Sequence, residues 1–137
     1  QKLTIVRGNF SLVIDRIERR VILLNNGKFF AQYPIKTVPA NTPPKGTRRD
    51  DQGGKVAKVA EKIAWSLGGN RVTFTEDEYA QAAHWIVMNA AGNTLYSDPD
   101  PASGVKMNKP TTGLGLAPEH AAELATLIRK GTPVTIL

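Results

Sequence analysis

The sequence predicts a mainly β domain with one or two short helices. Apolar and polar residues alternate with period two over much of the first forty residues, as in half-buried strands. A clear helical pattern occurs only near the C-terminus. The 137 residues are 41% hydrophobic and 22% charged, which is typical of one globular domain. We therefore expect a single domain over residues 1–137, and, because the chain opens on Gln1 without a targeting segment, one that belongs to a longer protein.

The first forty residues are expected to form an antiparallel meander. Asn26-Gly27 lies between two apolar runs and predicts a type I′ hairpin turn, since both residues tolerate positive φ. Pro34 is expected at the edge of the last strand. The expected strands are residues 3–5, 10–14, 21–24 and 28–33.

Residues 37–54 are rich in proline and glycine and predict a long exposed loop. Residues 56–65 fit both the helical period and strand alternation, so both interpretations stay open. A short strand is expected at 71–74. Thr75 and Glu78 then have the spacing of a capping box, which predicts a short helix from about Glu76 to His84.

The last third predicts a second hairpin, a loop, a helix and a closing strand. The hairpin strands are residues 85–88 and 94–96, and the loop covers residues 97–115. Pro118 suits the first turn of the helix, Arg129 and Lys130 its last turn, and Gly131 its end. Residues 134–137 are expected to form the closing strand.

The charge and the cysteine content limit the kinds of site and partner that we expect for this chain. The chain has no cysteine, which excludes disulfides, thiolate metal sites and cysteine nucleophiles. No apolar run is long enough to span a membrane. Residues 1–68 hold 13 Lys+Arg and 5 Asp+Glu, whereas residues 69–137 hold 5 and 7, so an anionic partner would be favoured by the first half. No nucleic-acid-binding motif accompanies this charge, and we expect no nucleic-acid partner.

Few residues have the spacing of a catalytic or metal site. His84 is expected to be a structural histidine and His120 to be exposed, so no metal or other cofactor is expected. Asp98-Pro99-Asp100 lacks the remaining ligands of a calcium loop and is expected to be a solvated turn. Ser103 and Lys106 have the S-x-x-K spacing of some acyl transferases, without the companion motifs and in a segment that does not favour a helix.

Several segments resemble the L,D-transpeptidase (YkuD-type) catalytic domain. In that family a motif Ser/Thr-His-Gly-Cys-x-Arg leads into a helix and a closing Gly-Thr-Pro-Val strand. The matching segments are residues 6–10 (VRGNF), 23–35 (LLNNGKFFAQYPI), 42–47 (TPPKGT), 115–124 (GLAPEHAAEL) and 130–136 (KGTPVTI). The resemblance implies a β-sandwich-like fold. It also implies an enzyme that cleaves a peptidoglycan stem peptide, holds the acyl group on cysteine and passes it to an amine.

The resemblance fails at the catalytic motif. Ungapped alignment places Gly113 at the cysteine and Gly115 at the arginine, with Thr112 and Thr111 at the glycine and histidine. A shift by one residue places Leu114 at the cysteine instead. Residues 95–101 (LYSDPDP) resemble the segment that carries another histidine of the family, with Tyr96 in its place.

The resemblance therefore implies a catalytically inactive domain in the cell envelope, periplasmic or extracytoplasmic, that binds peptidoglycan or an anionic wall polymer or serves as a scaffold. The expected ligand-binding residues are Tyr96, Ser97, Thr111, Thr112 and Gly113. Two alternatives stay open: an active acyl transferase that uses Ser103, Thr111 or Thr112 as nucleophile, and a protein-interaction module. Trp65 and Trp85 are expected in the core, with an aromatic surface as the alternative.

Overall fold

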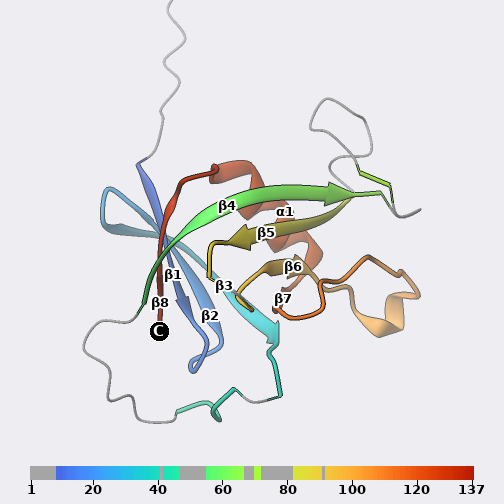
Figure 1. Ribbon diagram of the computed structural model, residues 1–137. Coiled ribbons are helices and arrows are strands. Elements are labelled where there is room, and N and C mark those ends of the chain that lie inside the picture. The colour runs from blue at the N-terminus through green and yellow to red at the C-terminus, as the bar shows by residue number, and fades with distance from the viewer. Residues whose placement is uncertain (1–8, 41, 47–54, 67–69, 72–81, 91) are drawn as a thin grey trace, which may run out of the picture.

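In the computed structural model, eight strands form one sheet that closes on itself in the order β1-β2-β3-β7-β6-β5-β4-β8 (Figure 1). The structure describes residues 9–40, 42–46, 55–66, 70–71, 82–90 and 92–137. The strands are β1 (Phe10–Asp15), β2 (Arg20–Asn25), β3 (Lys28–Thr37), β4 (Lys55–Trp65), β5 (Ala83–Met88), β6 (Leu95–Ser97), β7 (Leu114–Leu116) and β8 (Pro133–Ile136). The helices are α1 (Pro118–Leu127) and a short 3-10 helix (Pro101–Ser103). The predicted mainly β class is thus confirmed.

Strands β1 to β3 form the predicted antiparallel meander. Asn26 and Gly27 have φ of 54° and 78°, as a type I′ turn requires. β3 continues past Pro34 to Thr37, farther than predicted. Pro34 is the last residue of β3 paired with β2, and Ile35 is the first paired with β7. The proline therefore lies where β3 exchanges one partner strand for another.

The ambiguous segment 56–65 lies in β4. Its first residues, Lys55–Lys58, pair with β8, and Val59–Trp65 pair with β5. Ala57 and Val59 are buried while Val56 is 82% exposed, which is the alternation of a strand with one face in the core. β4 thus runs across both parts of the sheet (Figure 1). One part contains β8, β1, β2 and β3, and the other contains β5, β6 and β7.

The predicted second hairpin is present as β5 and β6, which pair antiparallel. The predicted loop at residues 97–115 is wrong at its end, because Leu114–Leu116 form β7, parallel to β6 and antiparallel to β3. The predicted helix at residues 76–84 is wrong at Ala83 and His84, which belong to β5. Its residues 76–81 lie outside the described residues.

The other predicted short strands lie mostly outside the described residues. The strand expected at residues 3–5 lies outside the described residues. Of the strand expected at 71–74, only Arg71 is described, and it forms an isolated bridge with Trp65.

Helix α1 begins at Pro118 as predicted but ends at Leu127, before Arg129 and Lys130. The Lys62 Nζ of β4 donates to the carbonyls of Ala125 and Ile128, both at 2.8 Å. Free carbonyls at a helix C-terminus carry partial negative charge, which favours a cation there. Burial and the charge of Arg129 lower the pKa of Lys62. None of the described helices has the length and apolar character needed to cross a membrane.

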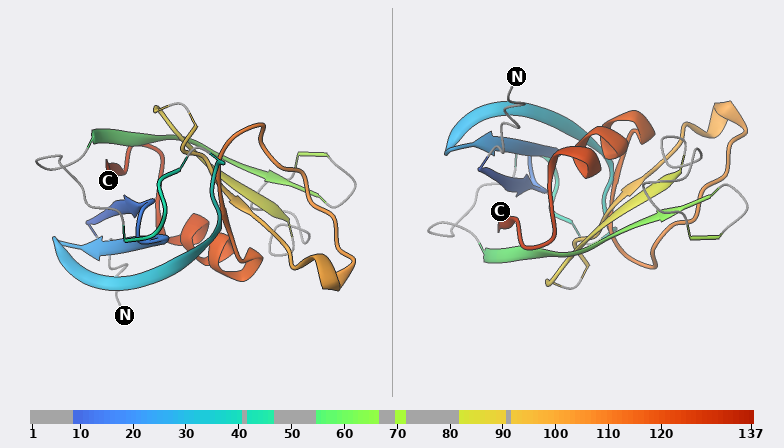
Figure 2. Two further views of the ribbon diagram at one scale, coloured as in Figure 1. Left: turned by 90° about the horizontal axis from the view of Figure 1, so that it is seen from below. Right: turned by 90° about the horizontal axis from the view of Figure 1, so that it is seen from above.

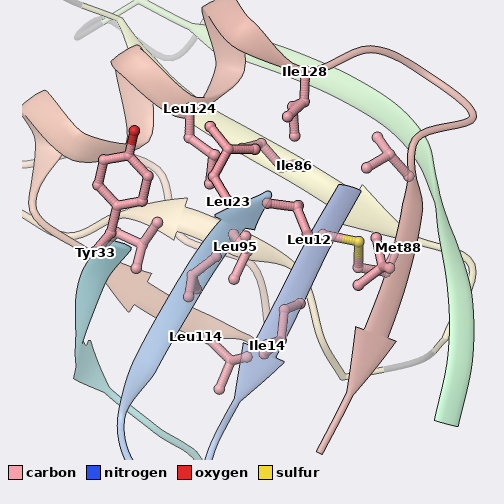
Figure 3. Close-up of a cluster of buried hydrophobic side chains, with 14 of the residues drawn as sticks. Leu12, Ile14, Leu23, Tyr33, Ile86, Met88, Leu95, Leu114, Leu124 and Ile128 are labelled. Carbon is pink, nitrogen blue, oxygen red and sulfur yellow. The ribbon is translucent and has the colours of Figure 1, made fainter. Parts of the chain in front are cut away.

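The core lies inside the closed sheet and beneath α1, which packs between the two parts of the sheet (Figure 2). Figure 3 shows that its side chains come from strands far apart in the sequence and from the helix. At most 1% of each remains exposed for Leu12, Ile14, Leu23, Ile86, Leu95, Leu114, Leu124 and Ile128. The alternate residues of β3, β7, β6 and β5 consequently face outward.

Candidate functional site

A row of outward-facing residues crosses four neighbouring strands. Thr37 of β3 is paired with Gly115 of β7, Gly115 with Tyr96 of β6, and Tyr96 with Trp85 of β5. Paired residues share a face of the sheet, and Leu95, Leu114, Leu116 and Ile86, which lie next to the row in β6, β7 and β5, belong to the core. The row therefore brings segments from both ends of the chain together.

Asp98 follows β6 and lies at the centre of a group of polar side chains. Its carboxylate accepts a hydrogen bond from the Thr37 hydroxyl and lies 3.3 Å from Lys109 Nζ. Its backbone carbonyl accepts from Lys36 Nζ at 2.7 Å. We call Lys36, Thr37, Tyr96, Asp98 and Lys109 the polar cluster. Asp98 is 7% exposed, and its contacts with the two ammonium groups and the hydroxyl offset the free-energy cost of burying it.

Tyr96 contributes a buried phenol side chain to the polar cluster. Burial raises the pKa of Tyr96 above its ordinary value, and the charge of Asp98 raises it further. The ammonium of Lys109 and a hydrogen bond with Thr37 act in the opposite direction. The phenol consequently stays protonated at neutral pH and serves as a neutral hydrogen-bonding group.

Gly115 lies between Asp98 and Thr37, where there is no room for a side chain. A Cβ atom at this position would lie 2.8 Å from Asp98 Oδ2 and 3.0 Å from Thr37 Cβ. At Gly113, a Cβ atom would lie 2.5 Å from the Thr94 carbonyl oxygen and 3.1 Å from the Tyr96 ring. Of these two positions, Gly115 is therefore the one that faces the Asp98 carboxylate, and it contributes no reactive atom.

The residues expected from the sequence to bind a ligand divide into three groups. Tyr96 lies in the polar cluster with Gly113 against its ring. Ser97 is fully buried, and its Oγ accepts a hydrogen bond from the backbone N–H of His84. Thr112 lines a different pocket, described below, and Thr111 is exposed.

Sequence reasoning missed Lys36, Thr37 and Lys109, and it interpreted Asp98 wrongly. The turn expected to be solvated buries Asp98, while Asp100 is exposed and accepts from the Ala102 N–H at 3.0 Å. No spacing rule joins Thr37 to Asp98, which are 61 residues apart. Only the pairing of β3 with β7 brings them together.

The two histidines lie away from the polar cluster. His84 is 2% exposed and shares the inward face of β5 with Ile86, in line with the structural role expected of it. His120, expected to be exposed, is partly covered by the Tyr33 ring at a centroid distance of 5.4 Å. Tyr33 donates to Glu123 Oε2 at 2.5 Å. Burial and this carboxylate raise the pKa of Tyr33 well above its ordinary range.

The expected burial of both tryptophans in the core is wrong, because they lie on the outer face. The Trp65 and Trp85 rings are tilted against each other at 5.3 Å, and the Arg71 guanidinium lies 5.6 Å from the Trp65 ring centre. Trp85 Nε1 donates to the Asn108 carbonyl at 3.1 Å. This bond joins the row to the segment that carries Lys109. The described residues contain no group of three or more His, Asp or Glu side chains able to hold a metal ion.

Comparison with known structures identifies the fold. No protein-family model matches the sequence, and no curated protein matches it. An L,D-transpeptidase from Mycobacterium smegmatis matches over 95% of this chain and 59% of its own, with 15% identity and a TM-score of 0.58. One from Stackebrandtia nassauensis matches over 98% and 58%, with 14% identity and a TM-score of 0.57. One from Enterococcus faecium, a cysteine-to-serine mutant, matches over 93% and 49%, with 15% identity and a TM-score of 0.54.

The chain therefore has the L,D-transpeptidase fold, as the resemblance implied. It spans between 49% and 59% of the length of these three proteins. At such low identity the likeness concerns the fold, so the function must be argued from the site.

Proposed function

We propose that this domain is a catalytically inactive relative of the L,D-transpeptidases that binds peptidoglycan through the polar cluster in the cell envelope. The observation that carries the proposal is Gly115, which faces the buried carboxylate of Asp98 without a side chain. Gly113, at the position that the resemblance assigns to the cysteine, likewise has no side chain and lies against the Tyr96 ring.

The groups required for acyl transfer are not assembled around Gly115. Such chemistry needs an activated nucleophile and a base within hydrogen-bonding distance of it. The chain has no cysteine, and its two histidines lie on the inward face of β5 and against Tyr33. Ser103 donates to the Asp100 carbonyl at 2.7 Å, and the positive φ of Gly104 ends its turn before Lys106. The alternative of a serine or threonine nucleophile is therefore not favoured.

The polar cluster suits a ligand with carboxylates. Lys36 and Lys109 are exposed residues, and each makes one contact with Asp98. An ammonium group has three N–H donors, so both lysines keep donors for a ligand. Peptidoglycan stem peptides carry carboxylates, and the excess of Lys and Arg in residues 1–68 also favours anionic wall polymers.

The test is retention of the protein on purified peptidoglycan that is collected by centrifugation. We expect the unchanged protein to pellet and K36Q/K109Q to stay largely in the supernatant. The control is K45Q/K130Q, which removes the same charge from two exposed lysines outside the polar cluster. Absence of retention for the unchanged protein, or equal loss with both pairs, would overturn binding through the polar cluster.

Inactivity is tested separately by mass spectrometry of muropeptides after incubation with the protein. We expect no new cross-link and no loss of a terminal residue. Either product would show an active acyl transferase and overturn the inactive assignment. A protein partner that co-purifies while wall material does not would favour a protein-interaction module instead.

A further inference from the structure

A pocket of about 200 Å³ lies beside the site, among the segments that connect the strands. It is bounded by the β1–β2 turn, the segment after β3, the β5–β6 turn and the residues before β7. Its lining residues are Arg16, Pro39, Thr42, Pro43, Gly92, Asn93 and Thr112. None of the five residues of the polar cluster is among them.

Arg16 gives this pocket a positive charge. It is the single charged residue among those that line the pocket, and no ion pair joins it to a described Asp or Glu side chain. Its Nε donates at 3.1 Å to the main-chain oxygen of Leu137, the last residue of the sequence, which leaves four further N–H donors on the guanidinium. The neighbouring Asp15 is engaged elsewhere, since it accepts from the Glu18 N–H at 3.0 Å and lies 3.9 Å from Arg20.

The walls of the pocket are tied together by Arg19. Its guanidinium donates to the carbonyl of Arg16 at 2.5 Å and to that of Pro43 at 3.1 Å. It thereby joins the β1–β2 turn to the segment after β3. Arg19 has a φ of 58°, which is uncommon for a residue other than glycine. The residue whose side chain links the two walls therefore has a left-handed backbone conformation, which the β1–β2 turn must stabilise.

We propose that this pocket binds one oxyanion, a carboxylate or a phosphate, borne by a small molecule or a chain end. A guanidinium with free N–H groups matches the geometry of such oxyanions, and two threonines, Thr42 and Thr112, line the pocket beside it. The volume lies below the roughly 300–1,000 Å³ of drug-sized sites, which favours a small ligand. Pro39 and Pro43 provide apolar walls for a short alkyl group next to the anion.

This inference is independent of peptidoglycan binding by the polar cluster, and its test uses small probes. The amide resonances of the protein are followed by NMR during titration with propionate and, separately, with inorganic phosphate at constant ionic strength. We expect saturable shifts centred on Thr42, Gly92 and Thr112 with at least one probe. Saturation by propionate alone identifies a carboxylate ligand, and saturation by phosphate alone identifies a phosphate ligand.

Two variants and a charge control decide whether the pocket is the site. R16Q and the pocket-filling T112L are each expected to weaken binding at least tenfold, while R129Q, with the same change in net charge at an exposed position, keeps it. The amide spectrum of each variant reports whether it is folded. Shifts that do not saturate with either probe, or folded R16Q and T112L that bind like the unchanged protein, would overturn the proposal. Retention on peptidoglycan is scored independently, so the two proposals succeed or fail separately.

Discussion

Replacing Gly115 with alanine tests whether the site excludes a side chain at this position. The new Cβ would lie 2.8 Å from Asp98 Oδ2, so the carboxylate must move by about 0.6 Å to reach an ordinary contact. The move disrupts its hydrogen bond with Thr37, and such bonds to charged groups contribute about 1.5–3 kcal/mol. The lower chain entropy of unfolded alanine offsets about 0.4–1 kcal/mol. The pair with Lys109, whose side chain is 55% exposed, adds little. We expect a net loss of about 1–2 kcal/mol.

The assay is urea unfolding of G115A, D98A and the double variant. D98A removes the oxygen nearest to the new methyl group but keeps the Cβ atoms of residues 98 and 37, both at 3.0 Å, so G115A is expected to cost less, though not nothing, in that background. The coupling between the two positions should reach about 1 kcal/mol or more. The explanation is wrong if G115A stabilises the unchanged protein, or if its effect is the same with and without the Asp98 carboxylate.

Two further predictions concern Lys62 at the end of α1 and the buried phenol of Tyr33. K62M removes two charge-assisted hydrogen bonds to the carbonyls at the end of α1 and should lower the free energy of unfolding by about 2 kcal/mol; an unchanged urea midpoint would contradict this cap. In the folded protein Tyr33 keeps its phenol proton, whereas in the unfolded chain Tyr33 releases it above the ordinary pKa of 10.0. The free energy of unfolding should therefore fall as the pH rises above about 10. Y33F should weaken that fall, as measured by urea midpoints at neutral and alkaline pH, and an identical alkaline loss in Y33F would refute the assignment to Tyr33.

The parts of the fold that the sequence predicted correctly depend on local signals. The Asn26-Gly27 turn and the alternation around it specify the first meander within a few residues. The other parts depend on distant partners. β7 is three residues long and is a strand because β3 and β6 pair with it on either side. Helix α1 ends early where Lys62, 66 residues from Ile128, supplies the donor for its last carbonyls.

The same distinction applies to the site. Tyr96 was predicted because its segment resembles a known motif, and in the structure its phenol lies near Asp98, Lys109 and Thr37. Lys36 and Thr37 follow Pro34 in a strand with no motif of its own. They reach Asp98 only because β3 changes partner at that proline. A change of pairing has no sequence signature, so neither side chain was predictable.

The charge around Gly115 is an obstacle to transpeptidase chemistry in addition to the missing thiol and the missing histidine base. A thiol at this position would lie next to the Asp98 carboxylate, and a neighbouring negative charge raises a thiol pKa and reduces the reactive thiolate. G115C should therefore react with iodoacetamide along a pH profile centred above the ordinary cysteine pKa of about 8.5. G115C/D98N should react at lower pH, by about one unit, because only the charge has been removed. Equal pH profiles for the two variants would show that the Asp98 carboxylate does not control the reactivity of a thiol at this position.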